Sequence, residues 1–105
     1  MKMKELLALI RNEPSVEFKY IMFHVENGLA RFIPVIFPDL LAHSQVAEHM
    51  LRAMPKGGTW RSAGSVLFTK NGIICSGRSE SMNLESHKDD SDIIAMYNYL
   101  HGISI

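Results

Sequence analysis

The dipeptide Asn-Gly occurs twice in this chain of 105 residues, at Asn27-Gly28 and Asn71-Gly72. Each copy lies between two runs rich in aromatic and β-branched residues. Asn and Gly both tolerate a positive φ, which the tight turns of β-hairpins require. The sequence therefore predicts two β-hairpins, with strands over Val16–Val25, Leu29–Phe37, Trp60–Thr69 and Ile73–Gly77.

Three further segments carry apolar residues three or four positions apart, the spacing of an amphipathic helix. The first helix is predicted over 1–13 and ends before Pro14. The second runs from an N-cap at Ser44 to about Ala53, and the third follows the helix-start pattern Ser86-x-x-Asp89 and ends near Gly102. Their apolar stripes are Met3, Leu6, Leu7 and Ile10; Val46, Ala47, Met50, Leu51 and Met54; and Ile93, Met96, Tyr97 and Leu100.

The order of these elements, α-ββ-α-ββ-α, predicts one α+β domain over residues 1–105. We expect the two hairpins to form a mainly antiparallel four-stranded sheet with the helices packed on it. Pro34 has no amide hydrogen to donate to a ladder, so the second strand should lie at an edge of the sheet or carry a bulge. The helix over 1–13 is too short to be stable alone, and we interpret it as a docking or oligomerisation element.

Composition narrows the class of protein. Eleven Lys and Arg balance eleven Asp and Glu, so the chain is neither a disordered acidic or basic tail nor a generic nucleic-acid binder, although nucleic acid remains an unfavoured alternative. The single cysteine, Cys75, excludes an internal disulfide and fits a reducing compartment. No apolar run reaches the length of a membrane span. We expect a cytoplasmic protein without a membrane segment.

The stretch that follows the last predicted strand is the candidate binding surface. Every charged residue from Arg52 to Arg78 is basic, and the strand ends there in Ser76-Gly77-Arg78-Ser79. If Arg61 converges on this loop, guanidinium and backbone N–H groups would suit a phosphate or carboxylate, and a neighbouring tryptophan could stack on a base. The predicted ligand-binding residues are Arg78, Ser76, Ser79, Arg61 and Trp60. Ordinary solvated hairpin charges are the alternative explanation of the same pattern.

Catalytic and metal sites have less support. No nucleophile elbow, Ser-x-x-Lys motif, P-loop or dinucleotide fingerprint occurs, so we predict no catalytic residue and no cofactor. Five histidines are scattered, and the acids between Glu85 and Asp92 lack calcium-loop spacing, so we predict no metal ligand. A small hydrolase or metal-dependent enzyme using Cys75, His87 or the Asp89–Asp92 acids is kept as the alternative.

Four segments resemble parts of small uncharacterised proteins encoded by phages and prophages. They are Tyr20-Ile-Met-Phe23, Ile36-Phe-Pro-Asp-Leu-Leu41, Ser62-Ala-Gly64 and Ser76-Gly-Arg-Ser-Glu-Ser-Met-Asn-Leu84. The resemblance spans about Phe18 to Asp92 and implies a compact accessory protein, one acting in phage–host conflict, with no active site to transfer.

The leading hypothesis is a non-enzymatic binding or interaction protein that uses the 76–81 loop to bind a phosphate-bearing small molecule or a protein partner. A structural homo-oligomer, formed by pairing of the N-terminal helices, is the second alternative.

Overall fold

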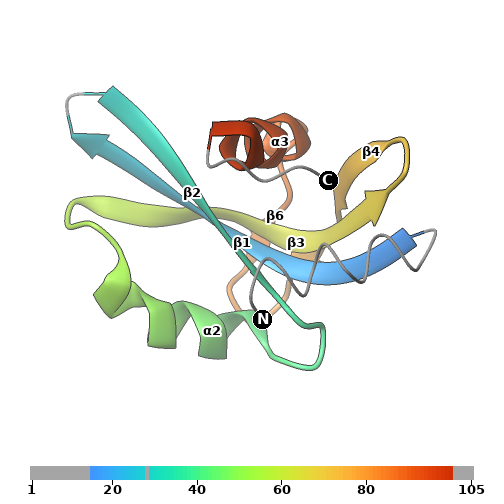
Figure 1. Cartoon of the computed structure of the whole chain (residues 1–105). Coiled ribbons are helices and arrows are strands. Elements are labelled where there is room, and N and C mark those ends of the chain that lie inside the picture. Colours follow the sequence, from blue (N-terminus) through green and yellow to red (C-terminus); the bar gives the residue numbers. More distant parts are fainter. Residues whose placement is uncertain (1–14, 28, 101–105) are drawn as a thin grey trace.

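The computed structural model describes residues 15–27 and 29–100, and shows a four-stranded antiparallel sheet with two α-helices (Figure 1). Strands β1 (Ser15–Asn27), β2 (Leu29–Phe37), β3 (Gly58–Thr69) and β4 (Gly72–Ser76) lie in the order β2-β1-β3-β4. The α+β class and the antiparallel sheet are therefore confirmed. Strand β2 is an edge strand, as Pro34 predicts, and Pro34 pairs with Met22 of β1.

Two helices and a small ribbon complete the described part of the chain. Helix α2 (His43–Met50) continues into a 3₁₀ turn, η1 (Leu51–Ala53), and α3 (Asp90–Leu100) ends the described residues. Strands β5 (Arg78–Ser79) and β6 (Leu84–Glu85) form a separate two-stranded ribbon, where the sequence predicts a loop. None of the helices in this part is long and apolar enough to cross a membrane.

Alternation of side chains along β1 divides the core between the two faces of the sheet. Tyr20 and Met22 face α3, where they pack with Phe18, Val66, Phe68 and Ile94. Ile21 faces α2 and packs with Phe37, Ala47 and Ala63, and residues of the β5–β6 segment lie against this second cluster. Figure 1 shows α3 on one side of the sheet and α2 on the other. The middle of β1, from Tyr20 to Phe23, is thus buried on both faces of the sheet.

A β-bulge interrupts the pairing of β1 with β3. Met22 pairs with Ser62 and Phe23 pairs with Trp60, so Arg61 is the extra residue. A bulge re-aims the side chains beside it. Trp60 stays on the α2 side, with its ring 4.8 Å from that of Phe23, while Arg61 lies against Phe32 on the α3 side.

Three details differ from the sequence-based expectations. The N-cap of α2 is Ala42, with no side-chain cap; Ser44 lies inside the first turn, where its amide donates a hydrogen bond to the Ser81 hydroxyl group. Helix α3 buries Asp90, Ile94 and Asn98, whereas Met96 and Leu100 of its predicted apolar stripe are exposed and Ile93 packs against the core while only partly buried. Asn71 has no positive φ; in the second turn only Gly72 does, at 138°. The predicted 1–13 helix, the Gly28 turn and the Gly102 cap lie outside the described residues.

Candidate functional site

Arg61 is held by acids at the start of α3. Its Nη2 atom donates to Asp89 Oδ1 and lies 3.5 Å from Asp90 Oδ1, and its guanidinium carbon lies 4.7 Å from the centre of the Phe32 ring. The Arg61 side chain is only 16% exposed. A mostly buried guanidinium group that is stacked on an aromatic ring and paired with two carboxylates is already neutralised, so it offers little free positive charge to a ligand.

Asp90 is the centre of this cluster and is fully buried. Its Oδ2 atom accepts hydrogen bonds from the Tyr20 hydroxyl group at 2.5 Å and from the His87 amide at 2.9 Å. Burial, and then the hydrogen bond to Asp90, raise the pKa of Tyr20 well above its usual value, so the hydroxyl group keeps its proton and remains a donor. These contacts tie the loop before α3 to the central strand. We call Tyr20, Arg61, Asp89 and Asp90 the internal polar cluster.

Arg78 lies apart from Arg61, on the β5–β6 ribbon. Its Nε atom is 3.3 Å from Glu80, its Nη1 atom is 3.7 Å from Glu85, and its Nη2 atom donates to Asn83 Oδ1 at 2.8 Å. Asn83 has a positive φ of 52°, which Asn tolerates better than most residues. Arg78 thus crosses the ribbon and connects both of its strands. We call Arg78, Glu80, Asn83 and Glu85 the ribbon face.

The serines beneath the ribbon face hold the turn together. Ser79 is buried, its hydroxyl group lies 3.3 Å from that of Ser81, and it accepts a hydrogen bond from the Met82 amide. Ser76 is exposed at the end of β4. The next residue, Gly77, has a φ of 79° and accepts a hydrogen bond from the Ser86 amide through its carbonyl oxygen.

The five predicted ligand-binding residues therefore do not form one set of contacts. Ser76, Arg78 and Ser79 stand together where β4 passes into β5. Arg61 belongs to the internal polar cluster, and Trp60 packs against Phe23 on the α2 side. The convergence of Arg61 on Arg78 that the sequence suggested is not found, because the β-bulge directs Arg61 to α3 and each arginine pairs with different acids.

Cys75 lies in β4 beside the internal polar cluster and is half-buried. Its amide donates to the Ser91 hydroxyl group at 2.9 Å, which fastens β4 to the first turn of α3. Desolvation by burial raises the pKa of the Cys75 thiol to about 11, although hydrogen bonding between the thiol itself and the Ser91 side chain acts in the opposite direction. The thiol is protonated at neutral pH and is a poor nucleophile.

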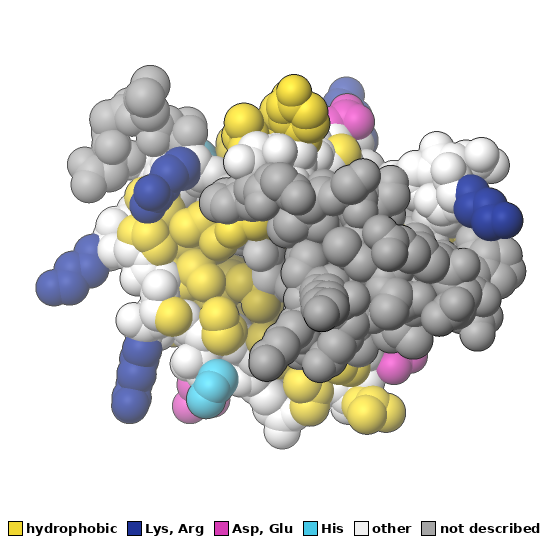
Figure 2. Space-filling view, in the orientation of Figure 1, with side chains coloured by type: hydrophobic (Ala, Val, Ile, Leu, Met, Phe, Trp, Pro, Cys, Tyr) yellow, Lys and Arg dark blue, Asp and Glu magenta, His cyan; other side chains and the backbone are white. Residues whose placement is uncertain are grey.

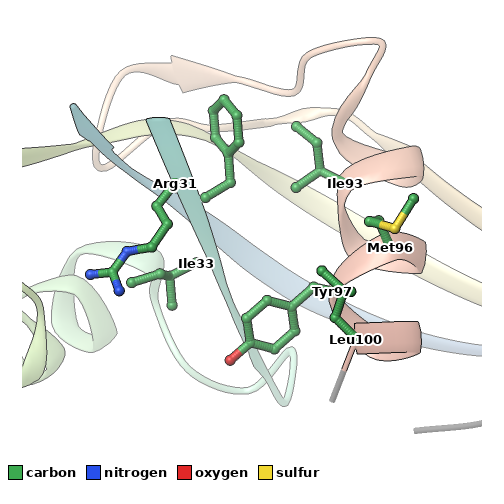
Figure 3. A pocket seen from close by; sticks show the side chains of 7 residues that line it. Arg31, Ile33, Ile93, Met96, Tyr97 and Leu100 are labelled. Carbon is green, nitrogen blue, oxygen red and sulfur yellow. The ribbon is translucent and has the colours of Figure 1, made fainter. Parts of the chain in front are cut away.

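A groove that was not predicted from the sequence lies between β2 and α3 (Figure 3). We call it the β2–α3 groove. It has a volume of about 550 Å³ and is lined by Arg31, Phe32, Ile33, Ile93, Met96, Tyr97 and Leu100. In Figure 2, hydrophobic side chains gather over α3 and over the neighbouring part of the sheet. The sequence did identify part of this groove, because four of its lining residues form the apolar stripe predicted for the last helix.

Neither a metal site nor a similar protein helps to assign a function to this chain. Within residues 15–27 and 29–100, no three His, Cys, Asp or Glu side chains come together in a way that could hold a metal ion. Comparison of the chain with protein-family models, with curated proteins and with solved structures finds no match.

Proposed function

We propose that this chain is a non-enzymatic interaction protein and that its ribbon face binds a protein partner. The proposal rests on one observation: the ribbon face is an exposed charged surface whose side chains are already paired with one another. Glu80 and Glu85 have side chains 85% and 74% exposed, yet both lie within 4 Å of Arg78. Side chains ordered before binding lose less conformational entropy when a partner arrives, which favours association.

The charges of the ribbon face favour a protein over a phosphate-bearing small molecule. Two carboxylates flank the single guanidinium group of Arg78, so an incoming phosphate would meet two like charges at short range. A partner surface that presents both an acid and a base would match the pattern, because electrostatic complementarity favours alternating signs across an interface. The phosphate-bearing ligand remains the second candidate, and the positive φ of Gly77 beside Arg78 favours it, since such a conformation directs backbone N–H groups towards anions.

The contacts of the candidate catalytic residues do not support the alternative of a small hydrolase. The Cys75 thiol is protonated, and Asp90 is already occupied by Tyr20 and by the His87 amide. Asp89 is paired with Arg61. Each of these groups stabilises the junction between α3 and the sheet, and we therefore give none of them a catalytic role.

The type of protein and its cellular compartment are proposed from the sequence alone. The segment resemblances support an accessory protein of the type that phages and prophages encode. The single cysteine fits a location in the reducing cytoplasm. We keep the helix over 1–13 as the first element of the α-ββ-α-ββ-α order and as a candidate for self-association.

The test of the ribbon face compares two charge reversals of the same kind. Arg78→Glu changes the ribbon face, and Lys70→Glu changes an exposed residue at the turn between β3 and β4. Affinity purification from the cells that naturally produce the protein should recover a partner with wild type and with Lys70→Glu, but not with Arg78→Glu. Equal recovery with both variants would contradict the proposal.

A second measurement separates the two candidate ligands. Calorimetric titration with inorganic phosphate and a panel of nucleotides should show no binding if the ribbon face serves a protein. Saturable binding that weakens with salt and is lost in Arg78→Ala would instead establish the phosphate-bearing ligand. Thermal unfolding of every variant shows whether a loss of binding reflects a loss of fold.

A further inference from the structure

The β2–α3 groove opens along the outer edge of β2. Successive side chains of a strand point to opposite faces of its sheet, yet the consecutive residues Arg31, Phe32 and Ile33 all line this groove. Figure 3 shows Arg31 and Ile33 on the side of β2 that is turned away from α3. A groove lined from both faces of one strand passes around the edge of that strand. Within residues 15–27 and 29–100, β2 pairs only with β1, so no described strand covers this edge.

The register of the sheet indicates which backbone groups of β2 point outwards. The Cys75 amide donates to Ser91 of α3, so it points away from β3, and amide directions alternate along an antiparallel strand. The same alternation continues through the pairings of β3 with β1 and of β1 with β2, and it turns the odd-numbered residues of β2 towards β1. The N–H and C=O groups of Phe32 therefore point outwards, along the groove.

Pro34 limits how much of this edge can pair with another strand. It lies two residues from Phe32 and so points the same way, but its nitrogen carries no hydrogen. Proline at such a position discourages the pairing of one exposed edge with another. An added strand would find both a donor and an acceptor at Phe32 but only an acceptor at Pro34. Pairing is therefore favoured at the part of β2 that borders the groove.

The side chains on the two faces of this edge define what an added strand must carry. On the α3 side the wall of the groove is apolar, and its members Met96 and Leu100 are 58% and 71% exposed. On the other side Arg31 is exposed and is the only charged residue from Leu29 to Phe37. None of the ion pairs between residues that the structure describes includes Arg31. Apolar residues facing α3 and a carboxylate opposite Arg31 would match both faces, because opposite charges on paired strands attract.

We infer that the outer edge of β2 and the β2–α3 groove bind an extended segment of a partner protein, in which apolar residues alternate with an acidic residue. The segment lies beside β2 as an added strand. In this mode of recognition main-chain hydrogen bonds supply affinity and alternate side chains supply specificity. The surface is separate from the ribbon face, because the β5–β6 segment lies against the core cluster on the α2 side of the sheet, whereas the groove lies beside α3.

A second copy of the chain matches this edge less well. Two β2 strands paired edge to edge would bring together two copies of Arg31 and no carboxylate, because Leu29–Phe37 contains no acid. Like charges on paired strands weaken the pairing. The missing N–H group of Pro34 would also occur in both strands. Charge complementarity therefore favours a different strand, one that carries an acid.

The first test measures the binding of two synthetic peptides that differ in one charge. Both contain Leu-Thr-Leu-X-Leu between pairs of serines, with blocked ends, and X is Glu in one peptide and Lys in the other. In fluorescence polarisation titrations the wild-type protein should bind the Glu peptide about fivefold more tightly, as expected for one exposed charge pair between strands. Arg31→Glu should reverse the preference. No saturable binding of the Glu peptide, or equal binding of both peptides by wild type, would overturn the inference.

Amide hydrogen exchange tests the backbone pairing. The Phe32 amide should exchange readily in the free protein and become protected when the Glu peptide is bound. The Ile33 amide, which points towards β1, should be protected in both states. A Phe32 amide that is already protected in dilute free protein would show that the edge is covered without a partner. Protection that appears only as the protein concentration and the sedimentation mass rise would assign the edge to a second copy. Either result overturns the inference.

Matched variants separate this surface from the rest of α3 and from the ribbon face. Met96→Gln should weaken binding of the Glu peptide, whereas Tyr99→Gln should not, because Tyr99 is exposed on the same helix but does not line the groove. Arg78→Glu should leave peptide binding unchanged, so a failure of the ribbon face as a partner site would not affect this result. Equal effects of Met96→Gln and Tyr99→Gln, or a loss of binding in Arg78→Glu, would contradict the inference.

Discussion

The Tyr20 hydroxyl group donates a hydrogen bond of 2.5 Å to Asp90, which lies 70 residues further along the chain. Tyr20 belongs to the central strand and Asp90 begins α3, and both side chains are fully buried. The bond therefore fixes how α3 lies on the sheet. A buried carboxylate is costly unless it is paired, and the inward position of Asp90 brings its Oδ2 atom to the Tyr20 hydroxyl group and the His87 amide and its Oδ1 atom within 3.5 Å of Arg61. The same orientation leaves Met96 and Leu100 exposed at the groove.

Removing the Tyr20 hydroxyl group should destabilise the fold. Tyr20→Phe leaves the ring in place but takes one hydrogen bond from the buried carboxylate of Asp90, which we expect to lower the free energy of unfolding by about 1–3 kcal/mol. Urea denaturation of wild type and variant measures the difference. Tyr99→Phe, at an exposed position of α3, is the control and should change stability by less than about 0.5 kcal/mol. Similar effects of the two substitutions would show that the Tyr20–Asp90 bond contributes little.

The two arginines of the predicted site should behave differently when truncated. Arg61→Ala removes the cation nearest the buried Asp90 carboxylate and should cost about 3 kcal/mol or more. Arg78→Ala removes only contacts between exposed side chains and should cost no more than about 0.5 kcal/mol. Parallel urea denaturation curves make the comparison. A large loss with Arg78→Ala would instead make the β5–β6 ribbon a structural requirement of the fold.

Alkaline pH should weaken the fold through Cys75. Its pKa is raised to about 11 in the folded protein from a usual value of 9.0, so the folded state holds the proton more tightly than the unfolded state. The stability that results is fully present below about pH 9 and is lost as the pH rises towards 11. Urea denaturation from pH 8 to pH 11 measures this loss, and the dependence on pH should be smaller in Cys75→Ala. An alkylation rate that reached half its maximum near pH 9 in the folded protein would contradict the raised pKa.

Local patterns were sufficient to predict most of the sheet. Asn27-Gly28 and Asn71-Gly72 each lie between strands that pair, and Pro34 correctly indicated an edge. Both signals act between residues close in sequence, which is why a single sequence is enough to reveal them. The face that α3 buries was not predictable in this way, because its periodicity favours Met96 and Leu100, whereas the buried contact of Asp90 depends on Tyr20.

The candidate site was harder to predict for the same physical reason. The basic interval suggested that Arg61 and Arg78 act together, but a single extra residue in β3 directs Arg61 to the α3 side. The residues around Arg61 carry no strong sequence signature of a β-bulge. The β2–α3 groove depends on two elements separated by more than fifty residues, so its apolar members could be identified but not their arrangement.

The turn between β3 and β4 gives the last prediction, because its glycine has a backbone conformation that other residues rarely adopt. Gly72 has a φ of 138°, and a Cβ atom added there would meet no other atom within 4 Å. Gly72→Val should therefore destabilise through backbone strain alone, by about 1 kcal/mol or more. Lys70→Val adds the same side chain to the same turn at a position without positive φ, and should leave stability within about 0.5 kcal/mol of wild type. Urea denaturation compares the two, and equal stability of both variants with wild type would show that the turn accommodates a side chain at Gly72 by changing its conformation.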